Sequence, residues 1–130
     1  MDAETRFAAA RVARLATADA AGVPHLVPVT FALDAGEIVF AVDHKPKRST
    51  DLKRLRNIAA NPAVSFLADG YDEDWTRLWW VRADGHARVL DADPAAVAAL
   101  RAKYPQYRDH PPEGPVVRTT VSAWRSWASG

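Results

Sequence analysis

The stretch RLATADAAGVPHLVPVTFALDAGEIVFAVD, residues 14–43, decides the fold class. Two short turn sequences, DAAG at 19–22 and DAGE at 34–37, divide it into three largely apolar segments. Segments of this length that contain β-branched and aromatic residues and are bounded by Gly and Asp are typical of strands in hairpins. The stretch therefore predicts an antiparallel meander of three strands, with HLVPVTFAL as the second.

Three short helices are expected around these strands. The alanine-rich start DAETRFAAARVARLAT has its apolar residues at helical spacing. A second helix follows the meander, with Ser49 or Thr50 as its N-cap and Pro62 as its end. A third begins at Asp93 as N-cap, with Pro94 at the first helical position.

Further strands are predicted at 63–69, 75–91 and 116–127. The long segment 75–91 reads as one strand or a bent pair, because ADG at 83–85 is typical of a bulge or turn. The segment 105–115 contains four prolines and is predicted as a loop. Six or seven strands, mostly joined by hairpins, predict a mainly β chain: a small antiparallel barrel with short helices at its ends.

The bulk composition limits the class of protein. A chain of 130 residues predicts one domain, 1–130, and its net charge of +1 argues against a nucleic-acid-binding protein. There is no cysteine, and no apolar run approaches the roughly 18 residues that span a membrane. The four histidines and the acidic turn DGYDED lack the spacing of metal ligands. We therefore expect a soluble cytoplasmic protein with no metal and no membrane partner.

Positive charge is concentrated in DHKPKRSTDLKRLRN, residues 43–57. Its six cations are Lys45, Lys47, Arg48, Lys53, Arg54 and Arg56. Cations at the start of a helix oppose the helix dipole, whereas phosphate groups bind where such cations meet free backbone N–H groups and hydroxyls. The stretch is either a solvated helix face or a binding site for an anion, and its residues alone leave both interpretations open.

Two adjacent tryptophans, Trp79 and Trp80, lie in the predicted long strand. Neighbouring residues of a strand point to opposite faces of the sheet. Both faces are therefore expected to be covered, either by a two-sided core or by a partner subunit or flat ligand on one side. Three of the chain's five tryptophans fall within residues 75–80, which favours an aromatic interface or site.

The order of these segments resembles a known superfamily. RVARLATADAAGVPHLVPVTFALD, the basic turn, LKRLRNIAANPAVSFLAD and WWVRADGHARVLD together are similar to the pyridoxamine 5′-phosphate oxidase-like, split-barrel flavin-binding proteins. YDEDWTRLWWVRADG and KYPQYRDHPPEGPVVR resemble its actinobacterial branch of F420-dependent oxidoreductases. The resemblance implies an antiparallel, FMN-binding-protein-like split β-barrel that forms a homodimer with two cofactor sites at the subunit interface.

The resemblance also implies which residues contact the cofactor ring. Pro28 and Val29 match the early strand that lies along the ring system. Trp80, preceded by Trp79, stands where classical members carry a Gln contributed by the partner subunit. This departure disfavours FMN and pyridoxamine phosphate oxidation, and an aromatic residue there suits a deazaflavin ring.

The phosphate side of the cofactor is implied to lie on the basic turn and the helix after it. In many relatives a Lys stands where Arg54 precedes Asn57, so the positive charge is kept. The phosphate and polyglutamate tail of F420 need several cations, which a cluster of this size can supply. The residues expected to bind them are Lys45, Lys47, Arg48, Ser49, Thr50, Lys53 and Arg54.

The main hypothesis is an F420-dependent oxidoreductase that transfers a hydride between reduced F420 and a small, conjugated substrate. The cofactor carries the chemistry, so no catalytic side chain is named. Two alternatives stay open. One is an FMN-dependent oxidoreductase of the same fold, and the other is a carrier protein that binds F420 without turnover.

Overall fold

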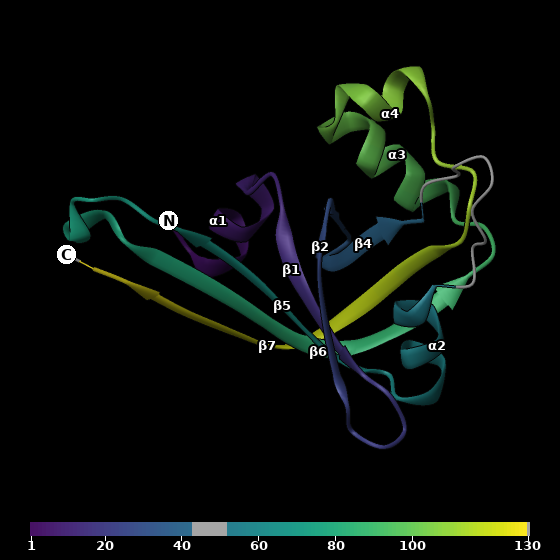
Figure 1. Cartoon of the computed structure of the whole chain (residues 1–130). Helices are drawn as coiled ribbons and strands as arrows, with labels where there is room; N and C mark the ends of the chain where they lie inside the picture. The colour runs from purple at the N-terminus through teal and green to yellow at the C-terminus, as the bar shows by residue number, and fades with distance from the viewer. Residues whose placement is uncertain (43–51, 130) are drawn as a thin grey trace.

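The chain forms one strongly curved antiparallel sheet (Figure 1). The computed structural model describes residues 1–42 and 52–129, and in those ranges seven strands pair in the order β2-β1-β5-β6-β7-β4-β3. The strands are β1 (Ala13–Ala18), β2 (Pro24–Val29), β3 (Ala32–Asp34), β4 (Glu37–Ala41), β5 (Ala63–Gly70), β6 (Trp79–Leu90) and β7 (Val116–Ala128). The predicted mainly β, antiparallel architecture is confirmed.

The two edge strands of this sheet, β2 and β3, follow each other directly in the chain. Only Thr30 and Phe31 separate them, although five other strands lie between them in the order of pairing. A link of this length spans only about 10 Å. The sheet must therefore curl until its edges approach each other, which makes a barrel that is open along one seam, a split barrel.

Short helices cover the barrel (Figure 1): α1 (Ala3–Ala9), α2 (Lys53–Ala60), α3 (Pro94–Lys103) and α4 (Pro105–Asp109). The Asp93 carboxylate accepts a hydrogen bond from Ala96 N at 3.1 Å, so α3 begins at the predicted N-cap. Helix α2 packs against β1 and β6, where the Asn57 amide donates to the Thr17 hydroxyl at 3.0 Å. Helices α3 and α4 lie together over β3 and β4, away from α2.

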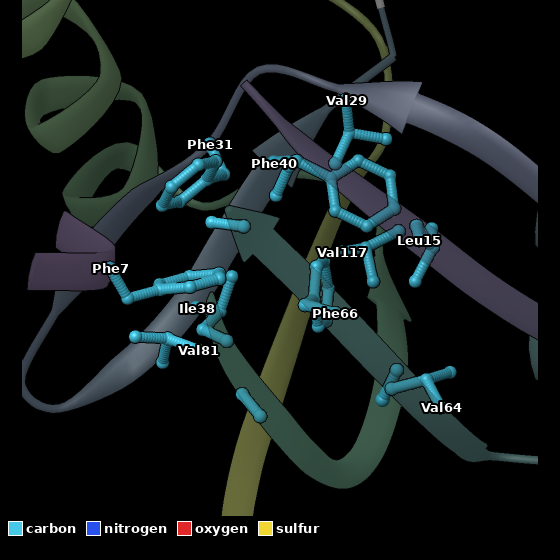
Figure 2. Packing of buried hydrophobic residues seen from close by; sticks show 14 of the residues in the cluster. Phe7, Leu15, Val29, Phe31, Ile38, Phe40, Val64, Phe66, Val81 and Val117 are labelled. Atoms are coloured by element: carbon cyan, nitrogen blue, oxygen red, sulfur yellow. The ribbon is translucent and has the colours of Figure 1, made fainter. Parts of the chain in front are cut away.

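The core is an aromatic cluster inside the barrel (Figure 2). Phe7 enters it from α1, and its ring lies 4.5 Å from that of Phe31 and 6.4 Å from that of Phe66, centroid to centroid. All three side chains are completely buried. Burying a side chain of this size contributes about 1.5–3 kcal/mol, so α1 stabilises the barrel even though it is only seven residues long.

The predicted meander is wrong at its centre. HLVPVTFAL was expected to form one strand, but β2 ends at Val29 and β3 begins at Ala32 on the opposite edge of the sheet. The break occurs because Phe31 turns into the core, where its backbone N–H donates to the Tyr104 hydroxyl at 3.1 Å. Tyr104 is distant in sequence, so no local pattern could have revealed this bond.

Two predictions for the helices also need correction. Neither Ser49 nor Thr50 is the N-cap of α2, because the helix begins at Lys53 and Leu52 occupies the cap position without a side-chain hydrogen bond. The predicted loop after α3 contains α4, since Pro105 starts a helical turn there instead of breaking one.

The pairing of β6 with β7 is irregular at the predicted ADG, and the extra residue is Ser122 of β7, because Asp84 pairs with Ala123 and Gly85 with Val121. The register between β6 and β7 shifts between Asp84 and Gly85, and a Cβ atom on Gly85 would overlap the Thr120 carbonyl oxygen. Because that oxygen belongs to a paired backbone, it cannot move aside as a flexible side chain would. The close approach of the two strands therefore requires glycine at position 85.

Gly85→Ala is expected to lower the free energy of unfolding by about 1–3 kcal/mol, the usual cost of overpacking. Urea unfolding followed by circular dichroism measures this change. Ser126→Ala, at an exposed position of β7, is the control and should change stability by less than about 0.5 kcal/mol. Equal midpoints for the two variants would show that the strands can separate at the bulge without cost.

Candidate functional site

The outer face of the sheet carries two of the four predicted ring-binding side chains, those of Pro28 and Trp80. Side chains along β6 alternate between the two faces of the sheet. Val81 and Ala83 are buried inside the barrel, whereas Trp80 and Arg82 point outward. Strand pairing sets Trp80 beside Asp69 of β5 and Trp127 of β7. The sheet thus brings together three side chains that are far apart in sequence.

A depression of about 500 Å³ opens at this place. Its apolar walls include Leu67, Leu78, Trp80 and Trp127, and Asp69 and Arg82 supply charged groups. Aromatic faces with a few polar groups are the usual lining of sites for flat organic ligands. The arrangement can therefore bind a planar ring system and orient it by charge.

Trp79 points away from Trp80, toward the barrel interior, as predicted for neighbouring strand residues. Its indole packs against the core cluster and carries the Arg6 guanidinium 5.2 Å from the ring centroid. A Cβ atom on Gly70 would overlap this indole, so the glycine allows Trp79 to lie across the end of β5. Trp79 also lines the depression, so both tryptophans reach it from opposite sides of the strand.

An ion pair fixes the orientation of Arg82. Its Nε atom donates to the Asp84 carboxylate at 2.9 Å, and the Ser65 hydroxyl donates to the same carboxylate at 2.8 Å. Burial alone would raise the pKa of Asp84, but these two hydrogen bonds and the charges of Arg82 and Arg125 outweigh it and hold the pKa below its usual value. Asp84 therefore stays ionised and keeps the guanidinium beside the depression.

The side chains of Pro28 and Val29 lie on opposite faces of β2. Pro28 is exposed on the outer face. Strand pairing places it in one row across the sheet with Arg14 of β1, Leu67 of β5 and Arg82 of β6. Val29 is 6% exposed and belongs to the core (Figure 2). Only the backbone of Val29 could face a ligand on the outer side, because adjacent strand side chains alternate.

Lys53 and Arg54 lie in the first turn of α2, at a different place on the chain. Lys53 is exposed and lies close enough to Asp19 to help lower its pKa, to which the backbone hydrogen bond from Val23 contributes most. In Figure 1, α2 and the C-terminal end of β7, which pairs with Trp79, lie at opposite ends of the molecule. One copy of the chain therefore does not bring Trp79 and Trp80 together with these cations.

The remaining predicted contacts, Lys45, Lys47, Arg48, Ser49 and Thr50, lie outside the described residues. Residues 52 and 53 resume the chain directly after them, so this basic segment leads into the start of α2.

Of the residues that line the depression, sequence reasoning predicted only Trp79 and Trp80, and it missed the others, among them Tyr71, Arg82 and Trp127. The sequence of the last strand indicates on which face of the sheet Trp127 lies, but it does not indicate which residue of another strand lies beside it. Only the pairing of Trp80 with Trp127 reveals that the two aromatics meet. The predicted strand over Trp75–Arg77 is a 3₁₀ turn, capped by the Asp74 carboxylate, that returns the chain to β6.

The described residues offer neither a metal site nor a membrane-spanning helix. Within 1–42 and 52–129, no group of three or more His, Asp or Glu side chains is placed to hold a metal ion. Across the same ranges, every helix is too short or too polar to cross a bilayer.

Several solved structures share this fold. The conserved hypothetical protein Rv2991 of Mycobacterium tuberculosis superimposes with a TM-score of 0.77 at 22% identity, over 96% of this chain and 81% of that one. The FAD binding protein of Mycobacterium smegmatis gives 0.65 at 20% identity, over 97% and 93%. HutZ, the heme storage protein of Vibrio cholerae, gives 0.73 at 17% identity, over 100% and 96%. At these identities the likeness establishes the fold alone.

No curated protein sequence matches the chain significantly. The sequence model of the pyridoxamine 5′-phosphate oxidase family, however, matches residues 2–128, almost the whole length. With the split barrel and the outer-face depression, this match establishes that the chain belongs to the pyridoxamine 5′-phosphate oxidase family.

Proposed function

We propose that the protein is an F420-dependent oxidoreductase that acts on a small conjugated substrate and shares each cofactor site between two copies of the chain. One observation carries this proposal: the two predicted ring-binding tryptophans and the cations at the start of α2 lie at opposite ends of one chain. Trp80 belongs to the outer face of the sheet and Lys53 to the start of α2. A twofold partner would set α2 of one copy beside Trp80 of the other.

The outer face has the character of a surface that a second copy covers. Leu26 is 69% exposed there and Trp127 is 46% exposed, although both are large apolar side chains. Leu67 and Pro28 continue the same surface. Apolar residues gathered on one sheet face favour burial against another protein surface, and a symmetric homodimer is the simplest such partner.

The residues present fit a flat, multiply anionic cofactor. Trp80 and Trp127 offer aromatic surface to a ring, and Arg82 is held rigidly beside them by Asp84. Lys53 and Arg54, with the basic segment before them, offer charge to a phosphate and an acidic tail. When bound, F420 supplies the hydride transfer.

Two features favour F420 over FMN. Trp80 has a single indole N–H donor and no acceptor, so it cannot reproduce the paired donor and acceptor of the Gln amide that it replaces with respect to classical relatives. The six cations of residues 43–57 also exceed what the single phosphate of FMN needs. FMN remains the second candidate because a flavin cofactor is bound by a structural relative, the FAD binding protein. A carrier without turnover is the third candidate, because one structural relative, HutZ, is a heme storage protein.

Fluorescence titration with F420 and with FMN tests the proposal. We expect F420 to bind more tightly, and Lys53→Gln to weaken its binding about three- to tenfold at low salt and less at high salt, because exposed charges are screened. Arg101→Gln removes one exposed cation on α3, outside the predicted site, and should leave F420 binding unchanged.

Tight binding of FMN and none of F420 would overturn the cofactor assignment, and a yellow protein purified from a host lacking F420 would agree with that result. Tight F420 binding without oxidation of reduced F420 by any conjugated acceptor would favour the carrier.

A further inference from the structure

A second cavity, of about 410 Å³, lies at the open seam of the barrel. It is lined by Arg11, Thr30, Tyr104, Gln106 and Tyr107. These residues come from the link between α1 and β1, the link between β2 and β3, and the region of α3 and α4. The cavity is separate from the depression at Trp80, with which it shares no lining residue.

Hydroxyl groups and aromatic rings shape this seam cavity. The Tyr104 hydroxyl donates to the Arg11 carbonyl oxygen at 2.9 Å and accepts from Phe31 N, which fixes it across the seam. The hydroxyls of Thr30 and Tyr107 lie 3.1 Å apart. The rings of Tyr104 and Tyr107 meet edge to face, 5.8 Å apart at 83°, so the cavity has two aromatic walls at right angles.

Arg11 lines the seam cavity, Lys103 lies against the Tyr104 ring next to it, and neither cation has a carboxylate partner among the described residues. The Arg11 guanidinium lies 5.0 Å from the Tyr104 ring centroid, and its Nη2 donates to the Lys103 carbonyl oxygen at 3.2 Å. The Lys103 ammonium lies 3.7 Å from the Phe31 ring centroid and donates to Ala10 O at 2.7 Å. In the described part of the chain, none of the ion pairs involves either cation.

This absence of a counter-charge has an electrostatic cost. Burial, and then the charge of Arg11, lower the pKa of Lys103 to about 8. Neighbouring like charges disfavour each other's charged form, and an anion between them would reverse that effect. Arg11 is itself exposed and lines the cavity, so its guanidinium is accessible to a ligand.

We propose that the seam cavity binds a small organic anion whose carboxylate pairs with Arg11 and whose flat apolar body packs into the corner formed by the Tyr104 and Tyr107 rings. A guanidinium matches a carboxylate with two parallel hydrogen bonds, and the tyrosine rings provide apolar walls. Lys103 lies behind these rings and acts through its charge as a positioning residue. This site does not depend on which cofactor the outer face binds.

The test is a titration of the full chain, without cofactor, with benzoate and with the neutral analogue benzyl alcohol. Amide chemical shifts of Thr30, Tyr104 and Tyr107 report occupancy of the cavity. We expect saturable benzoate binding with a dissociation constant on the order of 1 mM or tighter, and at least about tenfold weaker binding of benzyl alcohol.

Substitutions at position 11 distinguish a ligand site from a structural contact. Arg11→Gln should weaken benzoate binding at least about tenfold, and Arg11→Lys should weaken it less because the charge is kept. Arg77→Gln, the matched loss of one exposed cation, should have no effect. Melting temperatures without ligand show whether each variant is folded.

The pH profile gives a second readout. The groups that face Lys103 are the Arg11 guanidinium and the phenol of Tyr104, whose pKa is raised by burial. Benzoate affinity should fall as pH rises through about 8 and Lys103 loses its proton, and Lys103→Met should abolish that fall. If benzoate does not bind, or binds Arg11→Gln as tightly as the parent, Arg11 and Lys103 only join α3 to the α1–β1 link, and the proposal is overturned.

Discussion

Replacing Arg118 with methionine is expected to lower the free energy of unfolding by about 3–5 kcal/mol, the cost of leaving buried charges unpaired. Arg118 is 8% exposed, and its guanidinium binds Asp34 at 2.8 Å, Asp93 at 2.9 Å and Glu37 at 3.2 Å. These carboxylates belong to the β3–β4 hairpin and to the N-cap of α3. Loss of the guanidinium would leave three carboxylates repelling one another where the helix joins the sheet.

Arg88→Met is the matched control, because Arg88 also pairs with Glu37, at 3.1 Å, but its side chain is 48% exposed. An exposed pair of this kind contributes about 0–1 kcal/mol, so urea unfolding should separate the two variants clearly. Equal destabilisation by both would contradict a special role for the buried arginine.

Acid titration gives an independent check of the same cluster. Hydrogen bonds from Thr120, then Arg88 and Arg118, lower the pKa of Glu37 from 4.5 to about 2. A lowered folded-state pKa contributes stability that is present above pH 4.5 and is lost as the pH falls toward 2. The parent should lose stability in this window, and Arg118→Met should lose less because part of the favourable interaction is already absent.

Mixing two variants that each bind F420 poorly is expected to restore about one quarter of the cofactor sites, if each site is shared between two copies as proposed. Trp80→Ala removes aromatic surface from the outer face, and Lys53→Glu reverses a charge at the start of α2. In a heterodimer of the two variants, one site would carry both substitutions and the other neither. Half of the dimers in an equal, fully exchanged mixture are heterodimers, which gives the quarter. Equilibrium titration with F420 measures the restored capacity.

A second mixture controls for the geometry. A chain carrying both substitutions, mixed equally with the parent, should leave about one quarter of the sites intact when sites are shared, because both sites of each heterodimer are damaged. If each chain held a complete site of its own, the same mixture would keep about half, and the first mixture would restore nothing. That pair of results would exclude the shared site.

Local patterns predicted most of the individual elements. Alternating burial confirmed β5 and β6, and the register shift between Asp84 and Gly85 falls at the predicted ADG. β7 is a strand as predicted, but its first four residues are all buried instead of alternating. The Asp-Pro start of α3 is also confirmed. These predictions were correct because strand alternation, helix caps and proline positions depend on residues only a few positions apart in the sequence.

The candidate site could be predicted only in part. Pro28 and Trp80 do share the outer face, but the side chain of Val29 is in the core. The meeting of Trp80 with Trp127 depends on strand register, which neither segment contains by itself. For the cations, Lys53 and Arg54 lie at the start of α2, and their relation to Trp80 depends on a second copy of the chain.

The amino-acid sequence by itself determined the mainly β class, the element types and the concentration of cations before α2, because these follow from side-chain periodicity and composition. Only the tertiary structure decided that β2 and β3 are opposite edges of one sheet, since a buried Phe31 and its bond to Tyr104 break the expected strand. It also decided that Arg11 and Lys103 meet at the seam. The reason is the same in both cases: contacts between residues more than 70 positions apart form only when the sheet closes.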